Sequence, residues 1–172
     1  MPNRITYRKA TLEDCLAIAT LKGIVWNTTY KGIYSEESLK NYDILRNQKI
    51  FENIIQNPYI ELYVAICNEE IVGFMTYGKP FKPFMDFQQE IGMLYILQEY
   101  QRQGIGRTFL NIARQQTSQN GYNKFCVAVN KKNYSAQVFY CAMGGDTIDE
   151  TDSQIHLCFR VTAPDRDVAK RN

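Results

Sequence analysis

The sequence is poor in the residues from which most metal and covalent sites are built. It has a single histidine, His156, among 172 residues, which argues against a zinc site based on histidines. The five cysteines are scattered, odd in number and without a Cys-x-x-Cys pair. Such usage favours reduced thiols in the cytoplasm over a disulfide framework. We therefore expect no metal and no acyl-cysteine intermediate.

Long apolar runs and a strong charge of either sign are also missing. The longest apolar stretch, residues 91–97, is far shorter than the roughly 20 residues that span a bilayer. No apolar segment follows the basic residues at the N-terminus, so no signal peptide is expected. The formal net charge is +2, which gives no argument for a nucleic-acid or membrane partner. A cytoplasmic protein is the simplest expectation.

What remains is an ordinary globular composition, with 45% hydrophobic and 22% charged residues. At roughly 100–200 residues per domain, the length predicts one domain. We place this domain at residues 1–162 and expect a polar, frayed tail at residues 163–172.

Hydrophobic periodicity predicts a mixed α/β domain. Helices are expected from Thr11 onward, over 35–57 with an interruption, over 105–121 and over 136–143. A loop is expected over 26–32. Strands are expected at 5–8, 59–67, 71–77, 90–97, 125–129 and 154–161. The strand at 90–97 is apolar on both faces, so we expect it at the centre of the sheet.

The most informative segment is the glycine turn at residues 99–107, between that buried strand and an amphipathic helix. Free N–H groups and the positive end of the helix dipole make such a turn a site for phosphate. A P-loop is excluded because Arg107 follows Gly106 where lysine is required. A dinucleotide fingerprint fails because Phe109 replaces its third glycine. A plain strand-to-helix turn stays open as the alternative.

Two motifs in order resemble those of the GCN5-related N-acetyltransferases. Gln101-x-x-Gly104-x-Gly106 resembles the loop that binds the acyl-CoA pyrophosphate, and Asn133-x-x-Ala136-x-x-Phe139-Tyr140-x-x-x-Gly144 is similar to the family's later helix segment. The likeness covers roughly residues 6–161. It implies one domain with a central twisted mixed sheet of about six to seven strands, flanked by about four helices. One departure is Gly145, where the family usually has an aromatic residue, which puts the geometry around Tyr140 in question.

The resemblance also implies roles for single residues. Tyr140 would protonate the CoA thiolate, with core packing as the alternative. Glu90 would accept the amine proton, with a solvated strand start as the alternative, and strand alternation puts it on the face of Leu94 and Ile96. Asn133 would bind the pantetheine arm, cap its helix, or do both. The other residues expected to bind acetyl-CoA are Leu94, Tyr95, Ile96, Gln101, Arg102, Gln103, Gly104, Ile105, Gly106 and Arg107, and a backbone N–H in 94–96 would stabilise the oxyanion.

The expected activity is transfer of the acetyl group of acetyl-CoA to a primary amine by direct attack in a ternary complex. A small-molecule amine is favoured over a protein amine, and an acyl-CoA sensor with little turnover is the alternative. Trp26 and Tyr30 are candidates for the acceptor pocket, or else for core or dimer packing; a homodimer stays open. Three loop aromatics, Phe81, Phe84 and Phe87, suggest an apolar cleft or a partner surface. We expect His156 to be structural.

Overall fold

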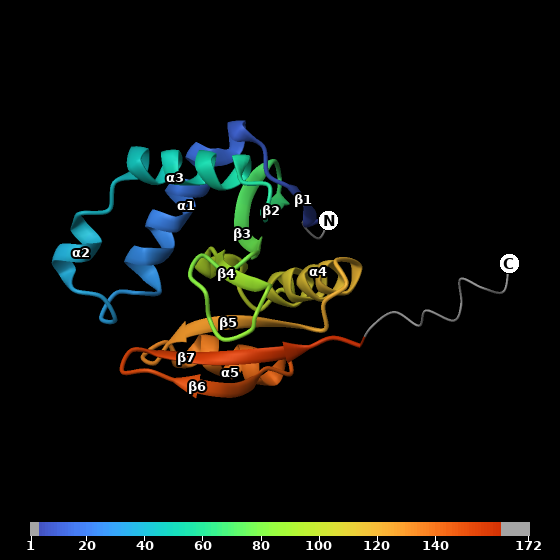
Figure 1. Cartoon of the computed structure of the whole chain (residues 1–172). Helices are drawn as coiled ribbons and strands as arrows, with labels where there is room; N and C mark the ends of the chain where they lie inside the picture. The colour runs from blue at the N-terminus through green and yellow to red at the C-terminus, as the bar shows by residue number, and fades with distance from the viewer. Residues whose placement is uncertain (1–3, 163–172) are drawn as a thin grey trace, which may run out of the picture.

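The fold is built on one seven-stranded sheet. A computed structural model describes residues 4–162 of the chain, so the predicted tail at 163–172 lies outside the described residues. The strand order is β1-β2-β3-β4-β5-β7-β6, and every neighbouring pair is antiparallel except β4 and β5 (Figure 1). The mixed α/β prediction is confirmed. The strands are β1 (Thr6–Lys9), β2 (Ile60–Cys67), β3 (Glu70–Gly78), β4 (Glu90–Ile96), β5 (Lys124–Asn130), β6 (Asp146–Glu150) and β7 (Gln154–Arg160).

Five α-helices lie within residues 4–162, one more than the approximate number expected. They are α1 (Cys15–Thr28), α2 (Glu36–Lys40), α3 (Ile44–Gln56), α4 (Ile105–Gln119) and α5 (Tyr134–Ala142). The extra helix comes from the region 35–57, which is divided in two. Ser35 caps α2 and Asp43 caps α3, each side chain accepting a backbone N–H three residues ahead. None of these helices combines the length and apolarity that crossing a membrane requires.

One local prediction was wrong. Residues 26–28 were expected in a loop, but α1 continues to Thr28. Polar side chains close the last turn of this helix by bonding back to its own carbonyls. The Asn27 amide donates to the Gly23 carbonyl at 2.9 Å, and the Thr28 hydroxyl donates to the Ile24 carbonyl at 3.1 Å. The loop therefore begins after Thr28, and Trp26 lies on the helix.

Helices cover both faces of the sheet. On one face, Ile18 of α1 and Phe51 of α3 pack with Phe74 of β3 in one buried cluster. On the other face, Phe109 of α4 and Tyr140 of α5 pack in a second cluster with residues of β3, β5 and β7. Figure 1 shows α1 and α3 together above β3, and α5 against β5 to β7. The core thus fixes α4 and α5, which carry the two sequence motifs, on one side of the sheet.

The sheet opens between its two central strands. β4 and β5 pair at only two positions, Glu90 with Cys126 and Ile91 with Val127. Beyond these positions the strands diverge, and the later residues of β4 have no partner on β5. The parallel junction therefore leaves backbone groups free in the middle of the sheet.

A bulge in β4 changes which side chains share a face. Tyr77 pairs with Ile91 and Thr76 with Met93, which leaves Gly92 as an additional residue on β4. The Thr76 hydroxyl accepts the Met93 N–H at 2.9 Å in this irregular stretch. The bulge therefore breaks the strict alternation of side chains at Gly92.

This bulge corrects the predicted orientation of Glu90. Ile91, Leu94 and Ile96 all contact the same core cluster, so Glu90, which neighbours Ile91, lies on the opposite face. The prediction that Glu90 shares a face with Leu94 and Ile96 was wrong, because simple alternation does not survive an inserted residue.

Candidate active site

A cavity of about 180 Å³ lies where β4 and β5 diverge. Its walls come from four parts of the chain: the segment after α1, the two open strands, the start of α5 and the start of β7. The lining residues are Tyr30, Tyr34, Ile91, Gly92, Met93, Leu94, Tyr95, Val127, Ala128, Val129, Asn130, Asn133, Ala136, Tyr140 and Gln154. The opening of the sheet has thus produced a pocket, and most of the sequence-predicted site residues outside the glycine turn line it.

The exposed backbone of β4 can be assigned from its neighbours. The Met93 N–H bonds Thr76, and the Leu97 N–H bonds the Val72 carbonyl at 3.0 Å, so both groups point toward β3. Because N–H directions alternate along a strand, those of Leu94 and Ile96 point away from β3 and into the gap. The Leu94 N–H is therefore free to donate to a bound carbonyl.

The glycine turn is fastened to the end of the same strand. The Gln101 side-chain amide donates to the Ile96 carbonyl at 3.2 Å. Gly104 has φ +87° and Arg102 has φ +62°, which together reverse the chain into α4. The glutamine of the motif therefore has a structural partner here, and it positions the turn rather than projecting freely into solvent.

The turn presents unpaired N–H groups at the start of α4. The first helical hydrogen bond runs from the Thr108 N–H to the Gly104 carbonyl at 3.0 Å. The N–H groups of Ile105, Gly106 and Arg107 precede it and have no helical acceptor. They lie at the positive end of the helix dipole. An anion such as a pyrophosphate fits this arrangement.

The two motif glycines serve different purposes. A Cβ at Gly104 would meet nothing within 4 Å, so this position needs glycine for its positive φ alone. A Cβ at Gly106 would lie 2.7 Å from Cζ of Phe139 on α5. Gly106 thus lets α4 pack closely against the residue before Tyr140, which couples the first motif to the second.

We expect Gly106→Ala to lower the free energy of unfolding by about 1 kcal/mol. Overpacking against Phe139 typically costs about 1–3 kcal/mol, which outweighs the gain of roughly 0.8–1.0 kcal/mol from replacing a helical glycine. Urea unfolding measures the change. The same substitution in a Phe139→Leu background should cost less, because the opposing ring is gone. Equal costs in both backgrounds would contradict the contact.

Tyr140 lines the cavity and is largely buried. It is 7% exposed, and its hydroxyl has no hydrogen-bond partner within residues 4–162. Burial raises the pKa of Tyr140 well above the ordinary tyrosine value. The phenol therefore holds its proton at neutral pH, as a proton donor must.

Asn133 and Gly145 fix the two ends of the helix that carries Tyr140. The Asn133 side chain accepts the Ala136 N–H at 3.1 Å as the cap of α5, and the residue also lines the cavity. The Gly145 N–H donates to the Tyr140 carbonyl at 2.9 Å. A Cβ at Gly145 would lie 2.8 Å from Cζ of Phe159. The ring of Phe159 thus fills the space beside the position where an aromatic residue was expected.

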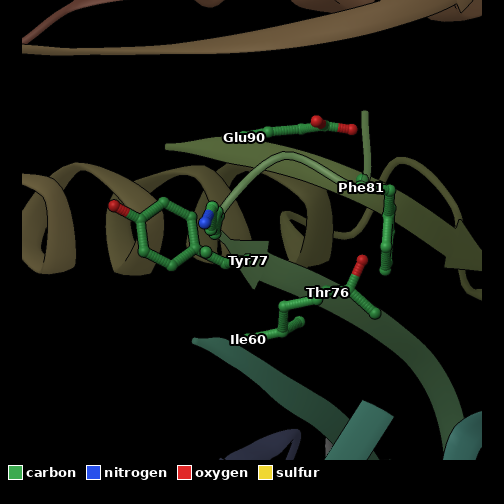
Figure 2. A pocket seen from close by; sticks show the side chains of 8 residues that line it. Ile60, Thr76, Tyr77, Phe81 and Glu90 are labelled. Carbon is green, nitrogen blue, oxygen red and sulfur yellow. The ribbon is translucent and has the colours of Figure 1, made fainter. Parts of the chain in front are cut away.

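Glu90 does not line the main cavity. It lies in a small neighbouring pocket with Phe81, Thr76 and Ile60, as Figure 2 shows, and Gly92 borders both spaces. Burial raises the pKa of Glu90 to about 6, although a hydrogen bond from the Phe81 backbone opposes the rise. A carboxylate with this pKa can accept a proton near neutral pH.

Tyrosines form the wall opposite α5. Tyr30 and Tyr34 stack with ring centroids 4.8 Å apart, and Tyr95 lies edge-on to Tyr30 at 6.1 Å. Trp26 does not line the cavity; its indole N–H donates to the Tyr95 hydroxyl at 3.4 Å and its ring packs on Tyr34. Sequence reasoning missed Tyr34, because it lies in the irregular segment between α1 and α2, where no local pattern marks it.

The remaining candidates lie outside the cavity. His156 stacks on Phe84 with ring centroids 4.1 Å apart, and its Nδ1 lies 3.8 Å from Asp149. Phe87 packs beside Phe84 and the buried thiol of Cys126. Among residues 4–162, no three His, Cys, Asp or Glu side chains gather in a way that would hold a metal ion.

Comparison with known families gives one clear match. The chain matches a family model described as an acetyltransferase (GNAT) domain over residues 30–159, which is most of its length.

Individual relatives agree with this match. The chain is 29% identical to an uncharacterized N-acetyltransferase, YuaI, of Bacillus subtilis, over 88% of this chain and 86% of the relative. It is 26% identical to a spermidine N(1)-acetyltransferase of Thermoplasma acidophilum, over 86% and 91% respectively. Among solved structures, the PaiA N-acetyltransferase of Thermoplasma acidophilum in complex with coenzyme A superposes with a TM-score of 0.77, at 23% identity, over 91% of this chain and 99% of that one.

Proposed function

Because the chain belongs to the GNAT acetyltransferase family, we propose that it transfers the acetyl group of acetyl-CoA to a primary amine by direct attack in a ternary complex. One observation carries the proposal. The cavity between β4 and β5 holds a protonated tyrosine and a free strand N–H, and an anion-binding turn stands at the end of the same strand. A proton donor, a donor for the carbonyl oxygen and a site for the pyrophosphate thus lie together around β4 and the turn that follows it.

Binding of acetyl-CoA is assigned to the turn and the open strand. The N–H groups at residues 103–107 would take the pyrophosphate, and the charges of Arg102 and Arg107 lie beside them on exposed positions. The free backbone of Leu94 and Ile96 would take the amides of the pantetheine arm, with Asn133 at the opposite wall. These residues orient the thioester toward Tyr140.

The chain's own groups complete the transfer. The amine nitrogen forms a bond to the acetyl carbon while the carbon–sulfur bond breaks. The Leu94 N–H stabilises the charge that develops on the carbonyl oxygen. Glu90 takes up the amine proton across Gly92, which borders both the cavity and the Glu90 pocket, and Tyr140 gives its proton to the departing thiolate. No cysteine lines the cavity within the described residues, in keeping with direct attack.

The acceptor is proposed to be a small cationic amine. Tyr30, Tyr34 and Tyr95 line the cavity, and aromatic rings attract ammonium groups. A molecule with several amino groups can hold one as a cation on these rings while another, neutral, attacks the thioester. Polyamines are the first acceptors to test, since one relative is a spermidine N(1)-acetyltransferase.

We expect thiol release from acetyl-CoA to be fastest with polyamines in a panel that also holds amino acids, aminoglycosides and short peptides. Thiol release gives the rate, and mass spectrometry of the product confirms an added acetyl group. The melting temperature with and without acetyl-CoA reports binding separately. Turnover with another amine class would overturn the acceptor alone. A melting shift without turnover would support the sensor alternative, and absence of both would overturn the use of acetyl-CoA.

A further inference from the structure

The pocket around Glu90 is closed by the loop between β3 and β4, residues 79–89. Glu90 is half-buried at the start of β4, and Phe81 of the loop borders the same pocket (Figure 2). The pocket has no room for a ligand, and its other walls are the ends of β2 and β3. The loop is therefore the element that separates the Glu90 carboxylate from solvent.

Phe81 meets the site at two points. Its backbone N–H lies near the Glu90 carboxylate and opposes the rise in the pKa of that group. Its ring covers Gly92, where a Cβ would lie 2.3 Å from Cε2 of the ring. Gly92 is the additional residue of the β4 bulge and borders the main cavity. One loop residue thus borders the pocket of the carboxylate and covers the backbone between that carboxylate and the cavity.

Core packing does not explain the position of Phe81. Its side chain is 49% exposed although it is large and apolar, and an exposed ring gains little from burial. The neighbouring loop aromatic Phe87 is 6% exposed and packs in a core cluster instead. The position of Phe81 is therefore better explained by what it covers than by core packing.

Charged neighbours do not account for the state of Glu90. Lys79 borders the pocket, but its ammonium lies over the Tyr59 ring at 5.5 Å. The Tyr77 hydroxyl is hydrogen-bonded to Thr117 at 2.7 Å. Cys126 pairs with Glu90 across the sheet and its pKa is raised to about 12, so it is a neutral thiol. Burial of the carboxylate beneath the 79–89 loop therefore remains as the cause of its raised pKa.

We propose that Phe81 is a positioning residue, which covers the pocket of the Glu90 carboxylate with its ring and keeps bulk water from that group. This inference rests on the proposed function, in which Glu90 accepts the amine proton. The loop at 79–89 then belongs to the proton-transfer machinery, although none of its residues lines the acetyl-transfer cavity.

The test is a titration of Glu90 in full-length protein by carbon NMR with labelled glutamate carboxyls, where Glu90→Gln identifies the signal. In the parent we expect a midpoint of about 6. In Phe81→Ala, water reaches the carboxylate and the midpoint should fall toward the ordinary value of 4.5. Phe81→Leu retains an apolar cover and should stay close to the parent. The acidic limb of kcat/KM for the amine should move with these midpoints.

Phe84→Ala is the matched control, because Phe84 is in the same loop but packs on His156. An unchanged midpoint in Phe81→Ala, or an equal fall in Phe84→Ala, overturns the proposal. If Phe81→Ala does not fold, Gly92→Ala displaces the ring by its Cβ and should lower the midpoint in the same direction; an unchanged midpoint there also overturns it. The titration needs no turnover, so a protein without acetyltransferase activity would contradict the proposed function and still decide the role of Phe81.

Discussion

Tyr140→Phe is expected to lower kcat by a factor of about 100–10,000 and to leave acetyl-CoA binding intact. A positioned general acid contributes typically about 10²–10⁴-fold. The substitution removes only the hydroxyl, and the remaining ring keeps its place among Phe139 and Phe159. The hydroxyl has no hydrogen-bond partner within residues 4–162, so its removal leaves no other group unsatisfied. The loss should therefore be catalytic rather than structural.

Three measurements check this. Thiol release at saturating amine gives kcat, the acetyl-CoA-dependent melting shift gives binding, and urea unfolding gives stability. Tyr134→Phe is the matched control, since Tyr134 starts the same helix but is 72% exposed. A kcat within a few-fold of the parent would contradict the general-acid assignment, and the thiolate would then leave without a proton from this residue.

The second large effect is expected from Glu90→Gln, as a loss of about 100-fold or more in kcat/KM for the amine above pH 6. The base works only when deprotonated. Because the pKa of Glu90 is about 6, protonation of this base should lower kcat/KM about tenfold for each pH unit below the pKa, beyond the change that protonation of the amine itself causes. The glutamine variant cannot accept the proton, and this limb should disappear.

A pH profile of kcat/KM with one amine tests the assignment. Glu13→Gln is a suitable control because Glu13 is exposed in the short 3-10 helix Leu12–Asp14 before α1, outside both pockets. A limb near pH 6 that persists in Glu90→Gln would show that another route carries the proton. A water chain in the cavity would then replace Glu90 in the mechanism.

The sequence predicted the parts of the site that depend on neighbours along the chain. The turn at 101–107 and the helix capped by Asn133 lie where they were expected, because a glycine with positive φ and an asparagine cap act within a few residues. The seven-stranded sheet also agrees with the expected six to seven strands. Short-range chemistry was sufficient for the turn and the cap, whereas the number of strands was expected from the resemblance to the family.

Contacts between distant segments account for what the sequence did not predict. The face of Glu90 depends on a bulge whose Met93 N–H is bound by Thr76, 17 residues earlier. Tyr34 joins the cavity because the chain after α1 folds Tyr30 and Tyr34 against Tyr95. No local pattern marks these pairings, so a reading by alternation or by motif could not reveal them.

The divergence of β4 and β5 has a consequence for the protein without substrate. Two parallel pairs join the strands, and beyond them each strand is in effect an edge inside the fold, with its amides open to exchange with solvent. A ligand that lies there and carries its own amides completes the ladder, in the manner of an added strand. The pantetheine arm of CoA has two such amides. Binding of the cosubstrate would then also complete the sheet. Without it, the centre of the sheet would be more dynamic, because the backbone amides of β4 and β5 lack partners there.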